Sequence, residues 1–218
     1  MGTTTIAIST RLARLLQLAS PTLPVGAYSY SGGLEAAIEA GVVSDARSAE
    51  SWIREVLELS VLRMELPVLL RMIRGDAAAW NTRLLASRET SELRAETVQM
   101  GYSLIRLLEE LGVARAELEE TSYPAAFSFA VKSWRIEPRE ALLAYAWAWI
   151  ENQVMAAVKA VPLGQTDGQR ILLALGSDLP AFVDKSLSME DHEMANFAPG
   201  LAILSSRHET QYSRLFRS

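Results

Sequence analysis

The sequence contains no cysteine, and this absence removes several kinds of chemistry at once. Without thiols there can be no disulfide framework, no thiolate nucleophile and no thiolate site for zinc or an iron–sulfur cluster. A chain that uses no disulfides is typical of a reducing compartment. We therefore expect this protein to act in the cytoplasm.

Basic charge and long apolar runs are also scarce. The formal net charge is -5, and the isoelectric point is about 5.2. A nucleic-acid partner normally requires a clustered basic face, which this composition does not favour. The longest unbroken apolar run, Ala141–Ile150, is far shorter than the roughly 20 residues that cross a bilayer. The sequence therefore predicts no nucleic-acid partner and no membrane.

What the sequence does contain is helical periodicity. Leu12, Leu15, Leu16 and Ala19 follow the i, i+3, i+4, i+7 spacing of an amphipathic helix. No segment shows the sustained alternation of β-branched residues that is typical of strands. Half of the 218 residues are apolar, which is enough for one sizeable core. We expect a single all-α domain over residues 1–218, built as a bundle of about eight to ten helices.

Proline, glycine and capping residues predict where these helices begin and end. The first helix is expected to end at Ser20, the second to span 34–40, and the third to begin at Ser44 or Asp45 with a kink or break at Pro67. The next two are expected to begin at Asp76 and at Thr90 or Ser91, the latter ending at Gly112. The remaining helices are expected over 124–134, over 138–160, from a Thr166–Gln169 capping box to Gly176, over 180–187, and from Pro199 onward. Between the first two, residues 21–33 hold two prolines and three glycines and form a loop. A loop of this length in a compact domain is usually functional.

The motifs of nucleotide binding and of serine catalysis are missing. A phosphate-binding loop needs two glycines five positions apart followed by a lysine, whereas Gly26 and Gly32 are further apart and no lysine follows. Neither a nucleophile elbow nor a serine three positions before a lysine occurs. The hydroxyl groups of Tyr28–Ser31 leave a small helical enzyme as the alternative, although such turns more often satisfy their own backbone.

Candidate metal ligands are few. His192 lies between Asp191 and Glu193, and His208 lies beside Glu209. Imidazole and carboxylate groups suit nickel or zinc, but adjacent residues point to different faces of a helix, so each cluster supplies one or two ligands. We expect no tight metal site, no cofactor and no catalytic residue in this chain.

Two further features are candidates for partner contacts. Lys159 ends a helix that is almost wholly apolar, where it either complements the helix dipole or belongs to a partner surface. The C-terminal tail, residues 207–218, contains too few apolar residues to pack by itself.

Four segments resemble the UreF family of urease accessory proteins. They are Leu16–Glu35 (LQLASPTLPVGAYSYSGGLE), Ser87–Arg94, Glu151–Gln165 and Arg207–Ser218 (RHETQYSRLFRS). They occur in the family's order and extend over nearly the whole chain, whereas Asp184–Phe197 matches no signature of the family. The resemblance implies an all-α homodimer that binds the accessory protein UreD, also called UreH. Through that complex it would recruit the GTPase UreG for nickel delivery to apo-urease, without hydrolysing nucleotide itself.

The resemblance also implies roles for named positions. Tyr28 and Arg214 correspond to contacts with UreG, and Lys159 corresponds to a lysine linked to partner control. The tail would become ordered on UreD through residues that include Arg207, His208, Glu209, Gln211, Tyr212, Arg214, Leu215 and Phe216. Tyrosine and arginine are common interface anchors, but Tyr28 could equally be a packed loop aromatic and Arg214 a frayed terminal charge. A helical adaptor with unrelated partners is the third reading.

Overall fold

The computed structural model describes residues 2–218, with side chains from Thr10 onward. This part of the chain is helical throughout its regular structure and contains no β-strand. Its α-helices are α1 (Gly2–Ala19), α2 (Leu34–Glu39), α3 (Ala46–Val56), α4 (Leu66–Arg74), α5 (Ala77–Ala86), α6 (Ser91–Glu110), α7 (Tyr123–Trp134), α8 (Pro138–Ala160), α9 (Gln165–Ser188) and α10 (Pro199–His208), with a 3-10 turn η1 (Ala27–Ser29) and a π-helical stretch η2 (Leu57–Glu65). The all-α class and the expected number of helices are confirmed.

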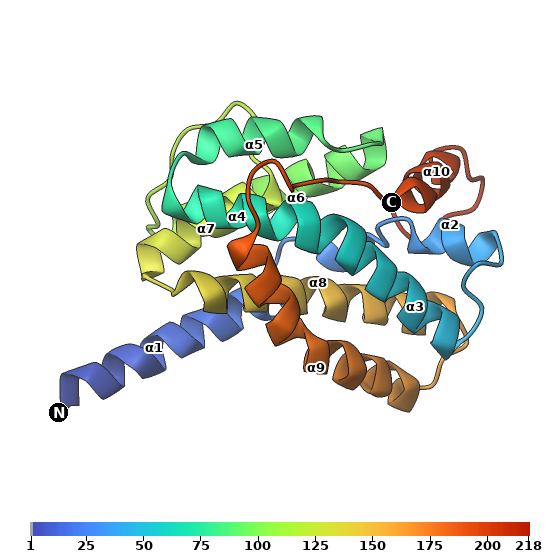
Figure 1. The fold of residues 1–218 in the computed structure, drawn as a ribbon, viewed down its shortest axis with the longest axis horizontal. Helices are drawn as coiled ribbons and strands as arrows, with labels where there is room; N and C mark the ends of the chain where they lie inside the picture. The colour runs from blue at the N-terminus through green and yellow to red at the C-terminus, as the bar shows by residue number, and fades with distance from the viewer. Residues whose placement is uncertain (1) are drawn as a thin grey trace.

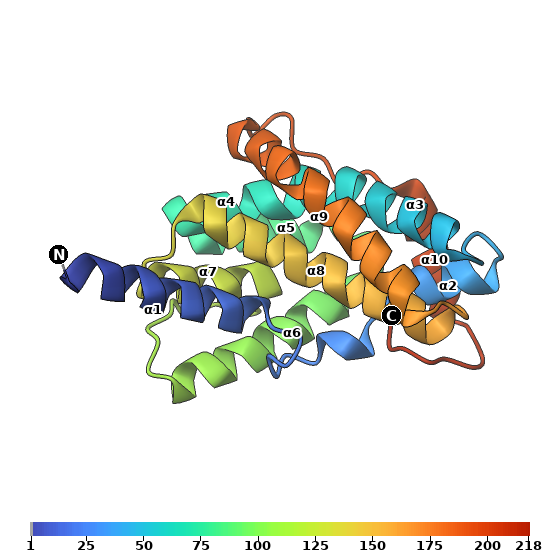
Figure 2. The same ribbon diagram turned by 90° about the horizontal axis from the view of Figure 1, so that it is seen from below.

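Helix α8 is the centre of the bundle. It packs against α1, α2, α3, α4 and α9, while α6 and α7 pack against each other. In Figures 1 and 2, α9 crosses beside α8 and α1 leads away from the body toward the N-terminus. The N-terminus lies at one end of the long axis and the C-terminus lies toward the other, next to α2 and α10 (Figure 1).

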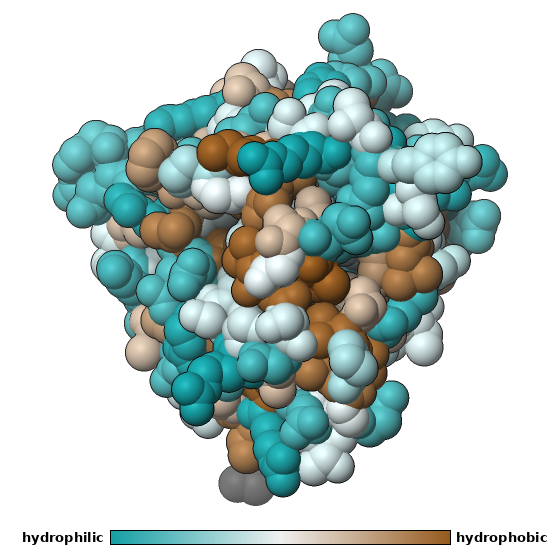
Figure 3. Space-filling view, turned by 90° about the vertical axis from the view of Figure 1, so that its right-hand side faces the viewer, coloured by the Kyte–Doolittle hydropathy of each residue, from teal (hydrophilic) through white to brown (hydrophobic). Residues whose placement is uncertain are grey.

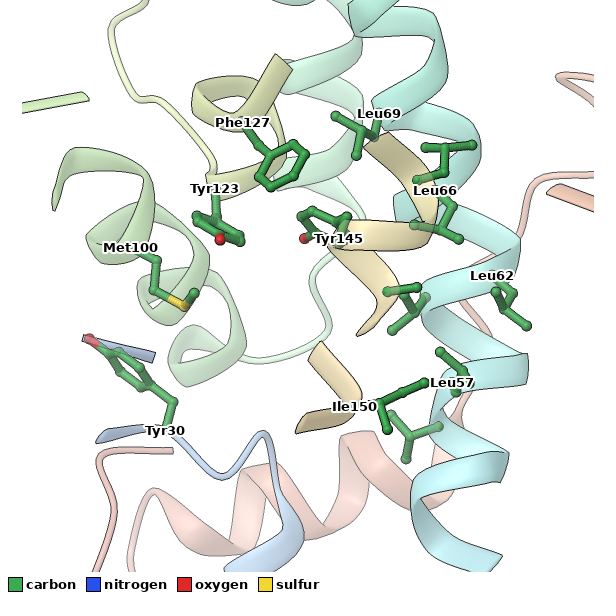
Figure 4. Close-up of a cluster of buried hydrophobic side chains, with 14 of the residues drawn as sticks. Tyr30, Leu57, Leu62, Leu66, Leu69, Met100, Tyr123, Phe127, Tyr145 and Ile150 are labelled. Carbon is green, nitrogen blue, oxygen red and sulfur yellow. The ribbon is translucent and has the colours of Figure 1, made fainter. Parts of the chain in front are cut away.

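The core is a continuous apolar cluster with aromatic rings at its centre. Figure 4 shows Tyr123, Phe127 and Tyr145 gathered between α6, α7, α8 and the α4 segment. The rings of Phe127 and Tyr145 are 5.3 Å apart at an interplanar angle of 89°, an edge-to-face contact. Tyr30, from the loop before α2, reaches the same cluster and is buried. The loop is therefore part of the core and not a free appendage.

Local start signals located most helices correctly. The Asp45 side chain accepts from Ser48 N at 2.8 Å and forms a capping box, and Asp76 caps α5. Thr90 caps α6, and Pro138 occupies the first turn of α8 as predicted. These signals act within a few residues, so the sequence alone suffices to read them.

The predicted division of residues 166–187 into two helices is wrong. A single helix, α9, runs from Gln165 to Ser188 through Gly176 and Pro180, and no side chain caps its start. A Cβ atom on Gly176 would lie 3.1 Å from Trp147 Cζ3 of α8. Glycine is at this position because α8 passes closely, not because the helix ends.

Pro67 does not break the helix that contains it. The chain remains helical from α3 through η2 into α4, and the change to π-helical hydrogen bonding lies before the proline. Such stretches re-aim side chains and often occur at functional sites. Here Glu65, the last residue of η2, is buried inside the molecule.

Candidate functional site at the C-terminal tail

The four segments that carry the family resemblance meet at one end of the bundle. Glu35 of the first segment binds the tail, and Ser91 of the second binds Glu209. In the third segment, Lys159 Nζ lies 4.6 Å from the centre of the Phe216 ring. Segments far apart in sequence therefore form one local structure, which includes the C-terminus beside α2 and α10 (Figure 1).

The tail is folded back onto the N-terminal loop. Arg217 N donates to Ser29 O at 2.8 Å, and Ser31 N donates to Ser218 O at 2.9 Å. The Phe216 side chain is buried, with 5 % of its surface exposed. The expectation that this tail cannot pack by itself is wrong. Its few apolar side chains are supplemented by backbone and ionic contacts that apolar content does not reveal.

Glu35 is the main anchor of the tail. Its Oε1 accepts from Leu215 N at 2.6 Å, and its Oε2 accepts from Phe216 N at 2.8 Å. Gln211 Nε2 and His208 Nε2 approach the same carboxylate at 3.4 Å and 3.3 Å. Through these contacts Glu35 fixes the tail's backbone as well as its side chains, because hydrogen bonds to a carboxylate are among the stronger ones in proteins.

A second carboxylate, Glu92, completes the ion cluster. Its Oε2 lies 2.7 Å from His208 Nδ1, and its Oε1 accepts from Arg214 Nη1 at 2.8 Å. His208 is fully buried between the two carboxylates. Arg214 also donates through Nη2 to Glu209 O and through Nε to Gln211 O, so its guanidinium closes the turn after α10.

Residues of α10 and the turn after it bind the first turn of α6. Glu209 Oε1 accepts from Ser91 Oγ at 2.6 Å and from Ser91 N at 3.2 Å, and these bonds lower the pKa of Glu209. Thr90 Oγ1 lies 2.8 Å from Ser205 Oγ. The N-terminus of a helix favours a carboxylate because its free N–H groups and dipole are positive.

A buried polar network lies beneath the tail. Arg88 Nη2 lies 2.7 Å from Glu65 Oε1, and the Tyr145 hydroxyl donates to Glu65 Oε2 at 2.5 Å. Burial raises the pKa of Tyr145, and the neighbouring Glu65 charge raises it further. Desolvation raises the pKa of Glu96 to about 7, against the opposing effect of a hydrogen bond from Ser218 Oγ. The end of the tail is thus connected to the interior.

A cavity of about 100 Å³ lies between this network and the N-terminal loop. Leu23, Val25 and Tyr28 line it from the loop, and Glu96 and Tyr145 line it from the bundle. Its remaining wall is mainly apolar.

Comparison with known proteins places the chain in a family. A family model described as UreF matches residues 43–176, which is more than half of the chain. The chain belongs to the UreF family. It is 55% identical to "Urease accessory protein UreF" of Azoarcus sp. (strain BH72) over 95% of each chain. It is 53% identical to the protein of that name from Methylobacillus flagellatus, over 96% of this chain and 99% of the relative. The corresponding protein of Dechloromonas aromatica is 49% identical, over 95% and 98% of the two chains. It is therefore a urease accessory protein.

The predicted contact residues of this UreF-family chain differ in accessibility. Those that are exposed are Tyr28, Lys159, Arg207, Glu209, Tyr212, Arg214 and Leu215; Gln211 is half-buried; His208 and Phe216 are buried. Tyr28 is next to Ser29, whose carbonyl group accepts from the tail, so it lies beside the tail. Figure 3 looks onto this end of the molecule, where apolar residues gather in the middle of a hydrophilic surround. His208 and Phe216 can serve a partner only indirectly, by holding the tail.

The alternative sites find little geometric support. His192 lies 3.4 Å from Glu190 on an exposed surface, and His208 faces Glu35 and Glu92 rather than its neighbour Glu209. Within residues 2–218, no group of three or more candidate ligands is arranged to hold a metal ion. No helix of that same range is long and apolar enough to span a membrane.

Two of the four hydroxyl residues proposed for catalysis, Tyr30 and Ser31, are buried in the fold. Ser31 is fully buried, and its Oγ donates to Ser218 O and accepts from Glu35 N. Tyr30 is buried in the core. The loop satisfies its own backbone and that of the tail.

Sequence reasoning missed the residues that hold the tail. Glu35, Glu92 and Glu96 were not singled out, although the first two lie inside segments that match the family. One sign was available, because Glu35 is a carboxylate at the start of the short, mainly apolar sequence LEAAIE. A charge within a largely buried helix requires a partner, but the sequence does not say which residue that is.

Proposed function

We propose that this chain is an assembly chaperone for urease. It acts in the cytoplasm as a homodimer that binds UreD/UreH, recruits and regulates the GTPase UreG, and supports nickel insertion into apo-urease. It hydrolyses no nucleotide itself. Membership of the UreF family supports this proposal, and the relatives in that family are named urease accessory proteins.

The observation that carries the scaffold role is the arrangement of the docked tail. Tyr212 and Leu215 project from it into solvent, while the backbone from Leu215 to Ser218 is hydrogen-bonded to Glu35 and the N-terminal loop. Tyr28 is exposed on the adjoining loop. A partner that binds here meets side chains whose backbone is already ordered, which lowers the entropic cost of association.

The exposed side chains are of the kind that anchors protein interfaces. Tyr28 and Tyr212 offer large rigid rings, and Arg214 offers a planar guanidinium that Glu92 holds in place. Tyrosine and arginine are enriched among residues that dominate binding energy. We assign Tyr28 and Arg214 to UreG, and the remaining exposed tail residues to UreD/UreH.

Co-purification tests the scaffold role. The full-length chain and a form ending at Ser206 are each mixed with UreD/UreH, and then with UreG, magnesium and GTP, and the complexes are sized by light scattering. The full-length chain should form the ternary complex with a mass that corresponds to two copies of each chain. Failure of the full-length chain to bind either partner would refute the proposal.

Because the shortened form loses buried residues, point variants provide a cleaner test. Tyr28→Ala and Tyr212→Ala change exposed side chains and should weaken assembly by about tenfold or more each, the usual effect of losing an anchor. Tyr102→Ala is the matched control, because Tyr102 is an exposed tyrosine on α6 outside the predicted contact set. Equal effects of all three changes would count against an interface at the tail.

A further inference from the structure

The cavity beneath the N-terminal loop has one polar end. Glu65, Arg88, Glu96, Tyr123 and Tyr145 line it there, whereas the rest of its wall is mainly apolar. The ring centres of Tyr123 and Tyr145 are 5.6 Å apart, and the two tyrosines lie within the aromatic cluster of the core (Figure 4). In binding sites, a polar end of this kind orients the bound molecule, and the apolar wall supplies most of the contact area.

Hydrogen-bond donors at the polar end are left without partners. The buried side chain of Arg88 donates through Nη2 to Glu65 Oε1 at 2.7 Å, but its Nε has no acceptor within residues 10–218. The hydroxyl group of Tyr123, a buried residue, makes no hydrogen bond within the same range. Buried donors without an acceptor are rare, because each has lost its hydrogen bonds to water. The guanidinium and the hydroxyl group are therefore available to a ligand.

The same end of the cavity also offers acceptors. Glu96 accepts from Ser218 Oγ through Oε2, and its Oε1 has no donor among the described residues. The Tyr145 hydroxyl donates to Glu65 Oε2, so its own oxygen can still accept. Donors and acceptors around one space match a primary amide, whose carbonyl oxygen accepts and whose NH₂ group donates.

The charges of the lining favour a neutral ligand. Glu65 and Arg88 neutralise each other as an ion pair. Desolvation raises the pKa of Glu96 to about 7, so this carboxyl group is mainly neutral at about pH 6. Glu89, the remaining charged residue of the lining, is exposed and accepts from Asn196 Nδ2. An ion in this space would be an uncompensated buried charge, which is costly.

Volume and access limit the ligand to a small molecule. The cavity has a volume of about 100 Å³. Since a cavity of about 150 Å³ can hold benzene, a molecule of about four to six non-hydrogen atoms fits here. Water alone suits the space poorly, because a buried water needs about two to four polar partners, which the apolar wall does not provide. Tyr28 and Met155 of the lining are exposed, so the cavity is reached from the surface between the loop and α8.

We propose that this cavity binds a small neutral molecule with an amide-like polar end and a short apolar body. The carbonyl group of the ligand accepts from Arg88 and Tyr123, and its NH₂ group donates to Glu96 and Tyr145. The apolar body lies against the wall that includes Met100. The site lies within one chain and requires no partner protein, so this inference goes beyond the scaffold role.

A titration of the full-length chain with propionamide at about pH 6 tests the site. Methionine methyl groups labelled with ¹³C report binding by NMR, because Met100 lines the cavity. We expect its methyl resonance to shift saturably, with a Kd on the order of 1 mM, as is usual for so small a ligand. Met72 is fully buried and does not line the cavity, so its resonance should stay unchanged.

Charged probes of similar size test the requirement for neutrality. Propionate has nearly the shape of propionamide but is an anion, and propylammonium is a cation. Each should bind at least about tenfold more weakly than propionamide, because each brings an uncompensated charge. Equal binding of propionate would contradict the proposed ligand class. No saturable shift with any of the three would show that the cavity holds water alone, and would overturn the proposal.

Tyr123→Phe tests the polar end with little change in shape. Loss of the free hydroxyl group should weaken propionamide binding by about two- to tenfold. Tyr30→Phe is the matched control, because Tyr30 is a buried tyrosine that does not line the cavity, and this variant should bind as the parent does. Equal weakening in both variants would contradict a specific role for Tyr123.

Two further variants test the guanidinium and the space itself. Arg88→Lys keeps a cation for Glu65 but removes the guanidinium, and should weaken binding by about tenfold or more. Ala148→Leu adds apolar atoms to the lining and should weaken binding by at least as much, because it fills the space. Binding that is unchanged in Ala148→Leu would show that propionamide binds elsewhere, and the proposed site would be wrong.

Discussion

Glu96 is a residue whose ionisation opposes folding. Desolvation raises its pKa from 4.5 to about 7 in the folded chain. Below about pH 4.5 the carboxyl group is protonated whether the chain is folded or unfolded, so it makes no difference to stability. Between about pH 4.5 and 7 the unfolded chain releases this proton first, and the free energy of unfolding falls as the pH rises. Above about pH 7 the carboxyl group is ionised in both states, and the free energy of unfolding falls no further on its account.

Glu96→Gln should therefore stabilise the protein at alkaline pH. We expect the free energy of unfolding at about pH 8 to rise by about 1–3 kcal/mol relative to the parent, with no gain at about pH 4. Urea unfolding at several pH values measures this difference. Glu119→Gln, at an exposed glutamate, is the control and should leave the profile unchanged. An equal gain at every pH would show that desolvation of the charge is not the cause.

The residues that hold the tail show why single sites resist prediction from sequence. His208 and Glu35 are 173 positions apart, and Leu215 and Glu35 are 180 apart. No local pattern relates positions at such separations. The family resemblance marked segments that meet at the tail, and it assigned the tail to partner binding without indicating that His208 and Phe216 are buried in the chain's own fold.

At the scale of elements, α6 and α7 are joined by a very close backbone approach. A Cβ atom on Gly101 of α6 would lie 2.0 Å from the carbonyl oxygen of Thr121, in the segment that leads into α7. Backbone atoms held by the following helix cannot move aside cheaply, unlike the end of a flexible side chain. Glycine is therefore required at this position by the packing of the two helices.

Gly101→Ala should lower the free energy of unfolding by about 2 kcal/mol or more, although alanine favours helices. Gly200→Ala in α10 is the matched control, because no atom lies within 4 Å of its added Cβ. That change should be neutral or stabilising by up to about 1 kcal/mol. Thermal unfolding of both variants measures the difference, and a stable Gly101→Ala protein would show that the helices can separate without cost.

A glycine, Gly176, also explains why the sequence predicts two helices where the structure has the single helix α9. A helix end and a close helix contact both select glycine, so Gly176 gives the same signal in either case. The caps at Asp45 and Thr90 were read correctly because hydroxyl and carboxylate caps act through local bonds. Helix ends set by nearby capping residues could be predicted from the sequence. A glycine selected by contact with a neighbouring helix could not be told apart from a helix end.

At the scale of the whole molecule, the tail closes the fold rather than trailing from it. It joins the N-terminal loop, α2, α6 and α8, so the first and last parts of the chain stabilise each other. Periodicity was enough to predict an all-α domain. The docking of the tail could not be predicted, because it depends on buried ionic and backbone contacts rather than on apolar content.

Adjacent tail residues should separate stability from partner binding. Phe216 is buried beneath Lys159, whereas Leu215 is 50% exposed. Phe216→Ala should lower the free energy of unfolding by about 3 kcal/mol, the usual cost of emptying a phenylalanine site, and should weaken UreD/UreH binding as the tail loosens. Leu215→Ala should change stability by no more than about 0.5 kcal/mol while weakening the same binding, because its side chain is exposed on the surface that we propose for the partner. Chemical unfolding and partner capture on both variants measure the two effects. If Leu215→Ala binds UreD/UreH as the parent does, the exposed face of the tail is not the interface. The tail would then contribute to the stability of the fold and not to partner binding.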